Sequence, residues 1–273
     1  MPPGPIPPTP YRPGLRRRTF SPTELRVFAD CPERYYRQYI GKEKVRAEFS
    51  RATLRGSAVH KVLAHVFSAR RDGEIIDDDL RFLAERFLPQ HNYKKAGAFS
   101  EWPSDVDSVV RLAETGLARV HGEAAILEVE TSFSHWRDTN SRVTGAELIG
   151  KVDLVYRHPE GFIEQIEFKT GFAQPDPFQQ VICRIGVREK YYAADTPLFS
   201  TTVQLTSGEE FPLDGDRSVL RTVLTEIEEI ILQIWSAETW PARDNDRCHF
   251  CNYRNTLCSL KGEWSQPNRL LDE

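Results

Sequence analysis

The sequence contains no apolar run long enough to cross a membrane. None of its 273 residues lies in an uninterrupted apolar stretch of eighteen or more, which excludes an ordinary transmembrane helix. The first ten residues, MPPGPIPPTP, are rich in proline and lack the basic and then apolar pattern of a secretory signal. We therefore expect a cytoplasmic protein that contacts no membrane.

Cysteine is scarce but unevenly distributed. Three of the five cysteines, Cys248, Cys251 and Cys258, lie within eleven residues. Because cytoplasmic thiols stay reduced, this cluster favours a metal site over disulfides. Three thiolates do not complete a four-thiolate site, so a fourth ligand must come from a distant part of the chain. Cys31 and Cys183 are the candidates.

Net charge is also small, at −4, but the basic residues gather near the start of the chain. Residues 11–55 carry twelve Lys and Arg against five acidic residues, a net of +7. A basic segment on an acidic body suits a protein that holds phosphates on one face. A solvated run of charges without a partner is the alternative.

The hydrophobic pattern divides the chain into helical and strand-forming parts. Residues 1–19 predict a flexible tail, rich in proline and then basic, ahead of a single domain over residues 20–273. S-P-T-E at Ser21 predicts the start of a helix through about Tyr39, which Pro32 should kink or break. Residues 70–122 predict a helical insertion, with patterns around 77–87 and 105–120 and a turn-rich H-N-Y-K-K-A-G between them. Other expected elements are a helix after Gly56, strands at 126–133, 148–156 and 161–171, a helix at 177–192, strands at 198–205 and 210–213, a helix at 217–235 and a cysteine-rich segment at 241–262.

Acidic residues interrupt two of the expected strands, which a short turn joins as a hairpin. Glu167 and Lys169 lie two apart and so share one face of their strand. A hairpin can bring Asp153 opposite Glu167, where two carboxylates repel unless a cation lies between them. Mg²⁺ prefers such oxygen ligands. The alternative is an exposed salt bridge without catalytic function.

These segments resemble a known active site. G-K-V-D-L-V-Y, a hairpin and I-E-F-K-T-G are similar to the motifs of the PD-(D/E)xK nuclease superfamily in its RecB-like branch. A histidine on an upstream helix of that branch binds metal, and G-S-A-V-H-K-V-L matches it at His60. The resemblance implies a restriction-endonuclease-like α/β fold, with a mixed central sheet flanked by helices.

The resemblance also implies roles for the matching residues. His60, Asp153 and Glu167 are expected to bind Mg²⁺ or Mn²⁺, and the carbonyl of Phe168 is expected to add a ligand. Lys169 is expected to orient the attacking water and to stabilise the transition state.

Other positions match the branch less closely. Gln180 is expected to position the site or the DNA strand, but Arg184 stands where the tyrosine of the usual Q-x-x-x-Y pattern would follow it. Val152 stands where other members have the proline of the motif, which leaves the metal chemistry unchanged. Glu130, on the strand before the motif, is a weaker candidate for the site.

The arrangement of one early and three late cysteines resembles a subset of this branch. It is similar to the CRISPR-associated RecB-like exonucleases and to the nuclease domains of AddAB-type helicase–nucleases, in which four thiolates hold a [4Fe–4S] cluster. Cys31 is the expected fourth ligand, because its helix can pack against the end of the chain, whereas Cys183 lies on the helix that should face the active site. The resemblance implies an iron–sulfur-bound cap that joins the two termini. Zinc, held by four cysteines or by three and His249, is the alternative, although six residues between the last two cysteines is unusual for zinc.

The function implied is metal-dependent cleavage of DNA, as an exonuclease on single-stranded ends, in CRISPR prespacer processing or in recombination and repair. A CRISPR integrase complex or a separate helicase chain is the expected partner, since the sequence has no G-x-x-x-x-G-K-[ST] motif of its own. The alternative is a non-catalytic iron–sulfur adaptor that binds DNA within an integrase or helicase complex.

Overall fold

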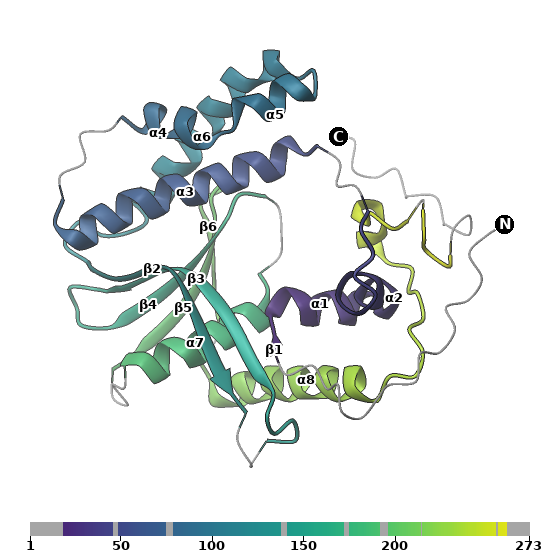
Figure 1. The fold of residues 1–273 in the computed structure, drawn as a ribbon. Coiled ribbons are helices and arrows are strands. Elements are labelled where there is room, and N and C mark those ends of the chain that lie inside the picture. Colours follow the sequence, from purple (N-terminus) through teal and green to yellow (C-terminus); the bar gives the residue numbers. More distant parts are fainter. Residues whose placement is uncertain are drawn as a thin grey trace.

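A computed structural model describes residues 19–45, 49–74, 79–137, 141–171, 175–191, 196–213, 215–254 and 256–260 (Figure 1). The expected flexible tail lies outside these residues, except that Thr19 belongs to the first strand. No helix in this described part is long and apolar enough to span a membrane.

A mixed sheet of six strands forms the centre of the described structure. Its strands are β1 (Thr19–Phe20), β2 (Ala125–Trp136), β3 (Glu147–Arg157), β4 (Ile163–Lys169), β5 (Leu198–Gln204) and β6 (Glu209–Pro212). The order is β1-β3-β4-β5-β6, with β2 paired along β3. The β3–β4 and β4–β5 pairs are antiparallel and parallel respectively. This confirms the expected α/β fold and the predicted hairpin.

Strand β3 has different partners along one of its edges. Strand β1 pairs with its first two residues, Glu147 and Leu148, and β4 pairs with residues 154–157. Residues 149–153 lie between these two ladders, and Asp153 is the last of them. The expected catalytic aspartate is therefore at the point where β4 separates from β3.

Helices cover both faces of the sheet. On one face, α3 (Arg51–Asp72) and α6 (Trp102–Ala118) bury a core with Leu154, Ile166 and Phe168. On the other, α1 (Pro22–Asp30), α7 (Pro177–Tyr191) and α8 (Arg217–Ser236) share a second core around Phe178 and Ile231. Figure 1 shows α3 and α6 on the side of the sheet opposite α7 and α8.

The first helical stretch breaks where proline predicts it. Helix α1 begins after Ser21, whose side chain accepts from the amide of Glu24, and ends before Cys31. Helix α2 (Pro32–Tyr35) starts at the proline and continues as a π-helical turn, η2 (Tyr36–Ile40). Cys31 therefore lies in the bend, as both the end of α1 and the cap of α2.

The start of helix α3 differs from the sequence-based expectation. Helix α3 begins at Arg51 rather than after Gly56, because the side chain of Ser50 caps it. A Cβ on Gly56 would lie 2.9 Å from Oγ1 of Thr170. The helix thus contains a glycine where it approaches the end of β4 closely.

The expected helical insertion contains more helix than its pattern suggests. It includes α4 (Leu80–Phe87), α5 (Gln90–Lys95), η3 (Phe99–Glu101) and α6. The stretch expected to be turn-rich forms α5, whose Tyr93 is fully buried. Burial of this aromatic side chain explains why the helix forms despite weak local signals.

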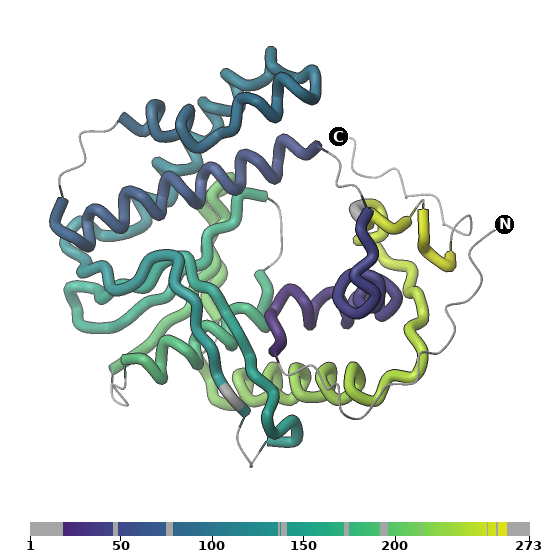
Figure 2. The backbone as a smooth tube through the Cα atoms, viewed as in Figure 1, coloured from purple at the N-terminus to yellow at the C-terminus, as the bar shows by residue number. Residues whose placement is uncertain are grey.

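The two ends of the described chain lie side by side. Figure 2 shows the purple N-terminal helices beside the yellow C-terminal segment. The side-chain amide of Asn245, just before η4 (Asp246–Phe250), donates to the carbonyl of Asp30 at 2.9 Å. The buried carboxylate of Glu33 accepts from the backbone amide and the hydroxyl of Ser259.

Candidate active site

Three acidic residues lie in a row across neighbouring strands. The β2–β3 ladder pairs Val129 with Leu154 and Thr131 with Val152, so Glu130 lies opposite Asp153. The β3–β4 ladder ends at the pair of Leu154 and Ile166, and the next position places Glu167 opposite Asp153. Asp153 is therefore flanked by a carboxylate on each side.

His60 reaches this row from helix α3. Its Nδ1 lies 3.1 Å from Oδ1 of Asp153 and 3.8 Å from Oε1 of Glu130. One ligand atom from each of these three residues lies within 4.8 Å of the other two, close enough to share a metal ion. Oxygen ligands with one imidazole suit a hard divalent cation such as Mg²⁺ or Mn²⁺.

Glu130 adopts an unusual backbone conformation. Its φ is +50°, in the left-handed region that residues other than glycine rarely adopt. Its carboxylate also forms an ion pair with Lys151, on the same face of β3 as Asp153. Backbone strain of this kind is concentrated at functional sites. Glu130 is therefore a stronger candidate for the site than its sequence pattern indicates.

Glu167 and Lys169 form the other half of the site. The Nζ of Lys169 lies 2.7 Å from Oε1 of Glu167 and 3.2 Å from Oε1 of Gln179. The backbone amide of Phe168, between them, donates to Oδ2 of Asp153 at 2.8 Å. The aspartate is thus fixed by the strand that carries the other two catalytic candidates.

The pKa values of these groups reflect a dense cluster of charge in the metal-free protein. Burial and the neighbouring Asp153 raise the pKa of Glu167 to about 7, although Lys169 opposes the shift. Burial lowers the pKa of His60, but hydrogen bonds to Asp153 and Glu130 outweigh it and bring the pKa to about 10. Burial likewise lowers the pKa of Lys169, and Glu167 more than offsets this, so that its pKa rises. Such perturbed groups are typical of functional sites.

The glutamine that contacts Lys169 is Gln179 rather than Gln180, whose expected role stays a prediction. Its side chain is buried and donates to the carbonyl of Phe211 at 3.1 Å, while the neighbouring Gln179 contacts Lys169. Successive residues on a helix point about 100° apart, which is why these two side chains have different partners. Arg184 donates to Ser200 on β5 rather than reaching the carboxylates.

Phe168 contacts the site through its backbone amide, whereas its side chain belongs to the core. Its ring is buried and stacks on Phe67 of α3, with ring centroids 6.2 Å apart. This packing fixes the strand between Glu167 and Lys169 against the helix that carries His60. Its carbonyl as a metal ligand remains a prediction.

The segment that holds the three clustered cysteines contacts the residues on either side of Cys31, since Asn245 donates to the carbonyl of Asp30 and the thiol of Cys258 donates to Glu33. Among the described residues, the group of three or more ligand atoms within 4.8 Å of one another is His60, Glu130 and Asp153, and it includes no cysteine. Burial is the largest cause that raises the pKa values of Cys248 and Cys258, and the charges of Cys31 and Cys251 raise them further. The pKa of Cys258 reaches about 11. Cys183 lies elsewhere, buried against Gly150 and donating to the carbonyl of Lys151.

His249 lies within the same C-terminal segment. Its Nδ1 is 2.8 Å from Nη1 of Arg254, on the next turn of the chain. The cysteine-rich segment thus contains three thiols and this imidazole, whereas the fourth thiol of the all-cysteine alternative, Cys31, lies in the bend between α1 and α2.

Comparison with known protein families identifies the family of this chain. The model of the PD-(D/E)XK nuclease superfamily matches residues 19–258. A candidate exonuclease from Eubacterium rectale is similar in structure, with 15% identity, a TM-score of 0.47 and coverage of 89% of this chain and 91% of its own. A protein named SSO0001 has 15% identity and a TM-score of 0.38, with coverage of 90% and 87%. No curated protein matches significantly. The family match spans the sheet, His60, the acidic row and all five cysteines, and the chain therefore belongs to the PD-(D/E)XK nuclease superfamily.

Proposed function

We propose that this protein is a divalent-metal-dependent deoxyribonuclease of the RecB-like branch that degrades single-stranded DNA from an end. The convergence of His60, Glu130 and Asp153 beside the Glu167–Lys169 pair carries this proposal. A binding protein without catalytic function has no need to hold three carboxylates in a row, because they repel one another without a cation.

The residues divide into a metal-binding group and a cationic residue, Lys169, that stabilises negative charge. His60, Asp153 and Glu167 would hold the cation, and Glu130 is placed to add a carboxylate. A divalent cation supplies charge neutralisation at the scissile phosphate and a more acidic water nucleophile. Neutral imidazole is the form that binds metal, so His60 must lose the proton that its raised pKa retains.

Lys169 is suited to act as a fixed cation and hydrogen-bond donor rather than as a base. Its raised pKa keeps the ammonium charged at neutral pH, and Glu167 and Gln179 fix its position. A fixed ammonium can orient the attacking water and stabilise the negative charge that develops on the phosphate. Preorganisation of this kind is effective because the group does not reorient during the reaction.

Cleavage of end-labelled single-stranded DNA with Mg²⁺ or Mn²⁺ tests this function. A chelator should abolish cleavage, and a circular single strand of the same length should resist it, since an exonuclease needs an end. Cleavage that survives the chelator contradicts the metal-dependent mechanism. Rapid cutting of the circle makes the enzyme an endonuclease.

We further propose that Cys31, Cys248, Cys251 and Cys258 hold a [4Fe–4S] cluster in a cap that joins the termini. The hydrogen bonds from Asn245 to Asp30 and from Cys258 to Glu33, on either side of Cys31, support a shared site. Protein purified without oxygen should be brown and contain about four iron and four sulfide per chain. One zinc and no iron would assign the site to zinc instead.

The protein would act together with a CRISPR integrase complex in prespacer processing, or with a separate helicase chain in repair. The resemblance to CRISPR-associated exonucleases and AddAB-type nuclease domains supports this proposal. The adaptor alternative predicts DNA binding without cleavage. It replaces the nuclease proposal if the purified protein binds single-stranded DNA but leaves it intact with either metal.

A further inference from the structure

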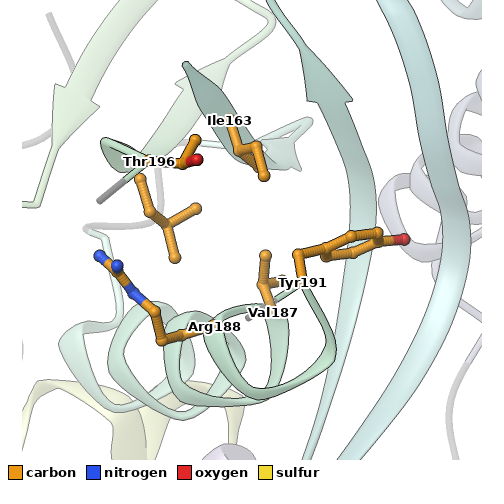
Figure 3. A pocket seen from close by; sticks show the side chains of 6 residues that line it. Ile163, Val187, Arg188, Tyr191 and Thr196 are labelled. Atoms are coloured by element: carbon orange, nitrogen blue, oxygen red, sulfur yellow. The ribbon is translucent and has the colours of Figure 1, made fainter. Parts of the chain in front are cut away.

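Two hollows formed by described residues lie at opposite ends of the parallel strands β4 and β5. The first, between Ile163 and Val187, measures about 10 Å³, room for one water molecule (Figure 3). The second, which we call the α3–α6 cleft, measures about 440 Å³ and begins at Thr170, next to Lys169. Ligands of open α/β sheets bind beyond the carboxyl ends of the strands, so the second hollow has the position of a ligand site.

Cationic and hydroxyl side chains from four elements line the α3–α6 cleft. They are Arg55 of α3, Ser108, Arg111 and Thr115 of α6, Thr170 after β4 and Thr206 after β5. The described lining residues include no aromatic side chain. Aromatic rings are the platforms on which single-stranded bases stack, whereas arginine and hydroxyl groups contact the phosphates and sugars.

Arg111 has a free charge with which to bind an anion. Its guanidinium donates to Ser108 at 3.3 Å, and no ion pair involves it within the described part of the chain. Arg55 shares Asp105 with Arg51, which binds that carboxylate through two nitrogens. Arg51 also pairs with Glu101 at 3.1 Å, so two carboxylates balance these two guanidinium groups. The uncompensated positive charge among the described lining residues is therefore that of Arg111.

The walls of the cleft are held rigidly. A Cβ on Gly116 of α6 would lie 2.9 Å from both methyl carbons of Leu63, so α6 packs closely on α3. The buried Asp105 also accepts from the hydroxyl of Tyr93 at 2.8 Å, which fixes α6 to α5. A preorganised site loses less conformational entropy when it binds its ligand.

We propose that the α3–α6 cleft binds the sugar–phosphate backbone of the nucleotides next to the cleaved bond, with Arg111 and Arg55 on phosphate oxygens. This inference rests on the proposed function and adds a substrate site to it. The helical insertion thereby takes part in holding the substrate. Contact with the backbone alone makes this binding independent of base sequence.

Binding of a fluorescent oligothymidylate to metal-free protein, followed by anisotropy, tests the cleft without cleavage. Arg111→Ala should raise Kd about five- to tenfold, the loss of one charge-assisted contact, and lower the slope of log affinity against log salt by about 0.7. Arg111→Lys should restore the slope. Arg221→Ala, on the exposed face of α8, makes the same charge change away from the cleft and should leave Kd unchanged.

A steric variant tests the same site without a change of charge. Thr115→Trp places a large side chain in the cleft and should raise Kd at least tenfold, with the melting temperature as a check on folding. If wild-type protein binds the oligonucleotide and both Arg111→Ala and Thr115→Trp match it, the cleft proposal is overturned while the nuclease proposal stands. If wild-type protein binds no single-stranded DNA, the proposed substrate itself is wrong.

Discussion

The Nδ1 atom of His60 lies 3.1 Å from Oδ1 of Asp153, although 93 residues separate them in sequence. This contact joins helix α3 to strand β3 at the centre of the acidic row. Burial lowers the pKa of His60, but this contact and the hydrogen bond to Glu130 outweigh burial and bring it to about 10, so the imidazole is charged at neutral pH. A metal ion and this proton therefore compete for the same nitrogen.

Metal binding should release about one proton per ion at pH 8. Glu167, with a pKa of about 7, is mostly ionised at that pH, so His60 is the main source. Affinity for Mn²⁺ should rise about tenfold per pH unit from pH 8 to 9, below the pKa of His60. Calorimetry in two buffers with different ionisation enthalpies measures the release. His60→Gln should abolish most of it, and equal heats in both buffers for the wild type would contradict the competition.

Removal of Asp153, Glu167 or Lys169 should each abolish most cleavage. Because residues that act as a unit give non-additive losses, a double alanine variant should be little worse than a single one. The Lys169 variant should still bind DNA, since its charge acts mainly in the transition state. Single-turnover rates and anisotropy separate the two effects. Wild-type cleavage by all three single variants would refute the assignment.

Substitution of Glu130 and substitution of Lys151 should change the affinity for Mn²⁺ in opposite directions. Glu130→Gln should weaken Mn²⁺ binding about tenfold, because it removes a candidate ligand. Lys151→Ala should strengthen binding severalfold, because it removes a cation that competes for Glu130. Titration calorimetry measures both. Unchanged affinity in Glu130→Gln would limit the metal ligands to the other residues.

Cys31→Ala should lose iron and become poorly soluble, because the energy of cluster binding is also folding energy. Cys183→Ala is the matched control, since Cys183 packs against β3 and lies apart from the other four cysteines. Iron and sulfide analysis of anaerobic protein measures the outcome. Equal iron loss in both variants would contradict the assignment of the fourth ligand.

The basic segment at residues 11–55 should make DNA binding depend on salt. Neutralising Arg16, Arg17 and Arg18 together should reduce the slope of log affinity against log salt by about 2, at about 0.7 for each phosphate contact. These three residues lie outside the described structure, so the prediction rests on the +7 charge of the segment. An unchanged slope would show that this part of the segment does not touch DNA.

Local pattern predicts the catalytic hairpin well. The alternation of Glu167, Phe168 and Lys169 fixes which face each side chain takes, and a short turn fixes Asp153 opposite. His60 depends on a contact across 93 residues, so only the family resemblance indicated it.

Other features depend on packing that the sequence does not reveal. The position of Glu130 follows from the register of β2 against β3 and from its left-handed backbone. The choice between Gln179 and Gln180 depends on the rotation of α7, which tertiary burial decides. Strand β1 is two residues long and has no periodic signal.

The contacts between the two ends of the chain also constrain when the protein can fold. The hydrogen bonds from Asn245 to Asp30 and from Ser259 to Glu33 span 215 and 226 residues. Contacts with such large sequence separation form late, because they close a long loop. The ribosome must therefore have synthesised Ser259 before Glu33 can form this hydrogen bond. During synthesis, helices α1 and α2 therefore gain these contacts only after more than 200 further residues have emerged.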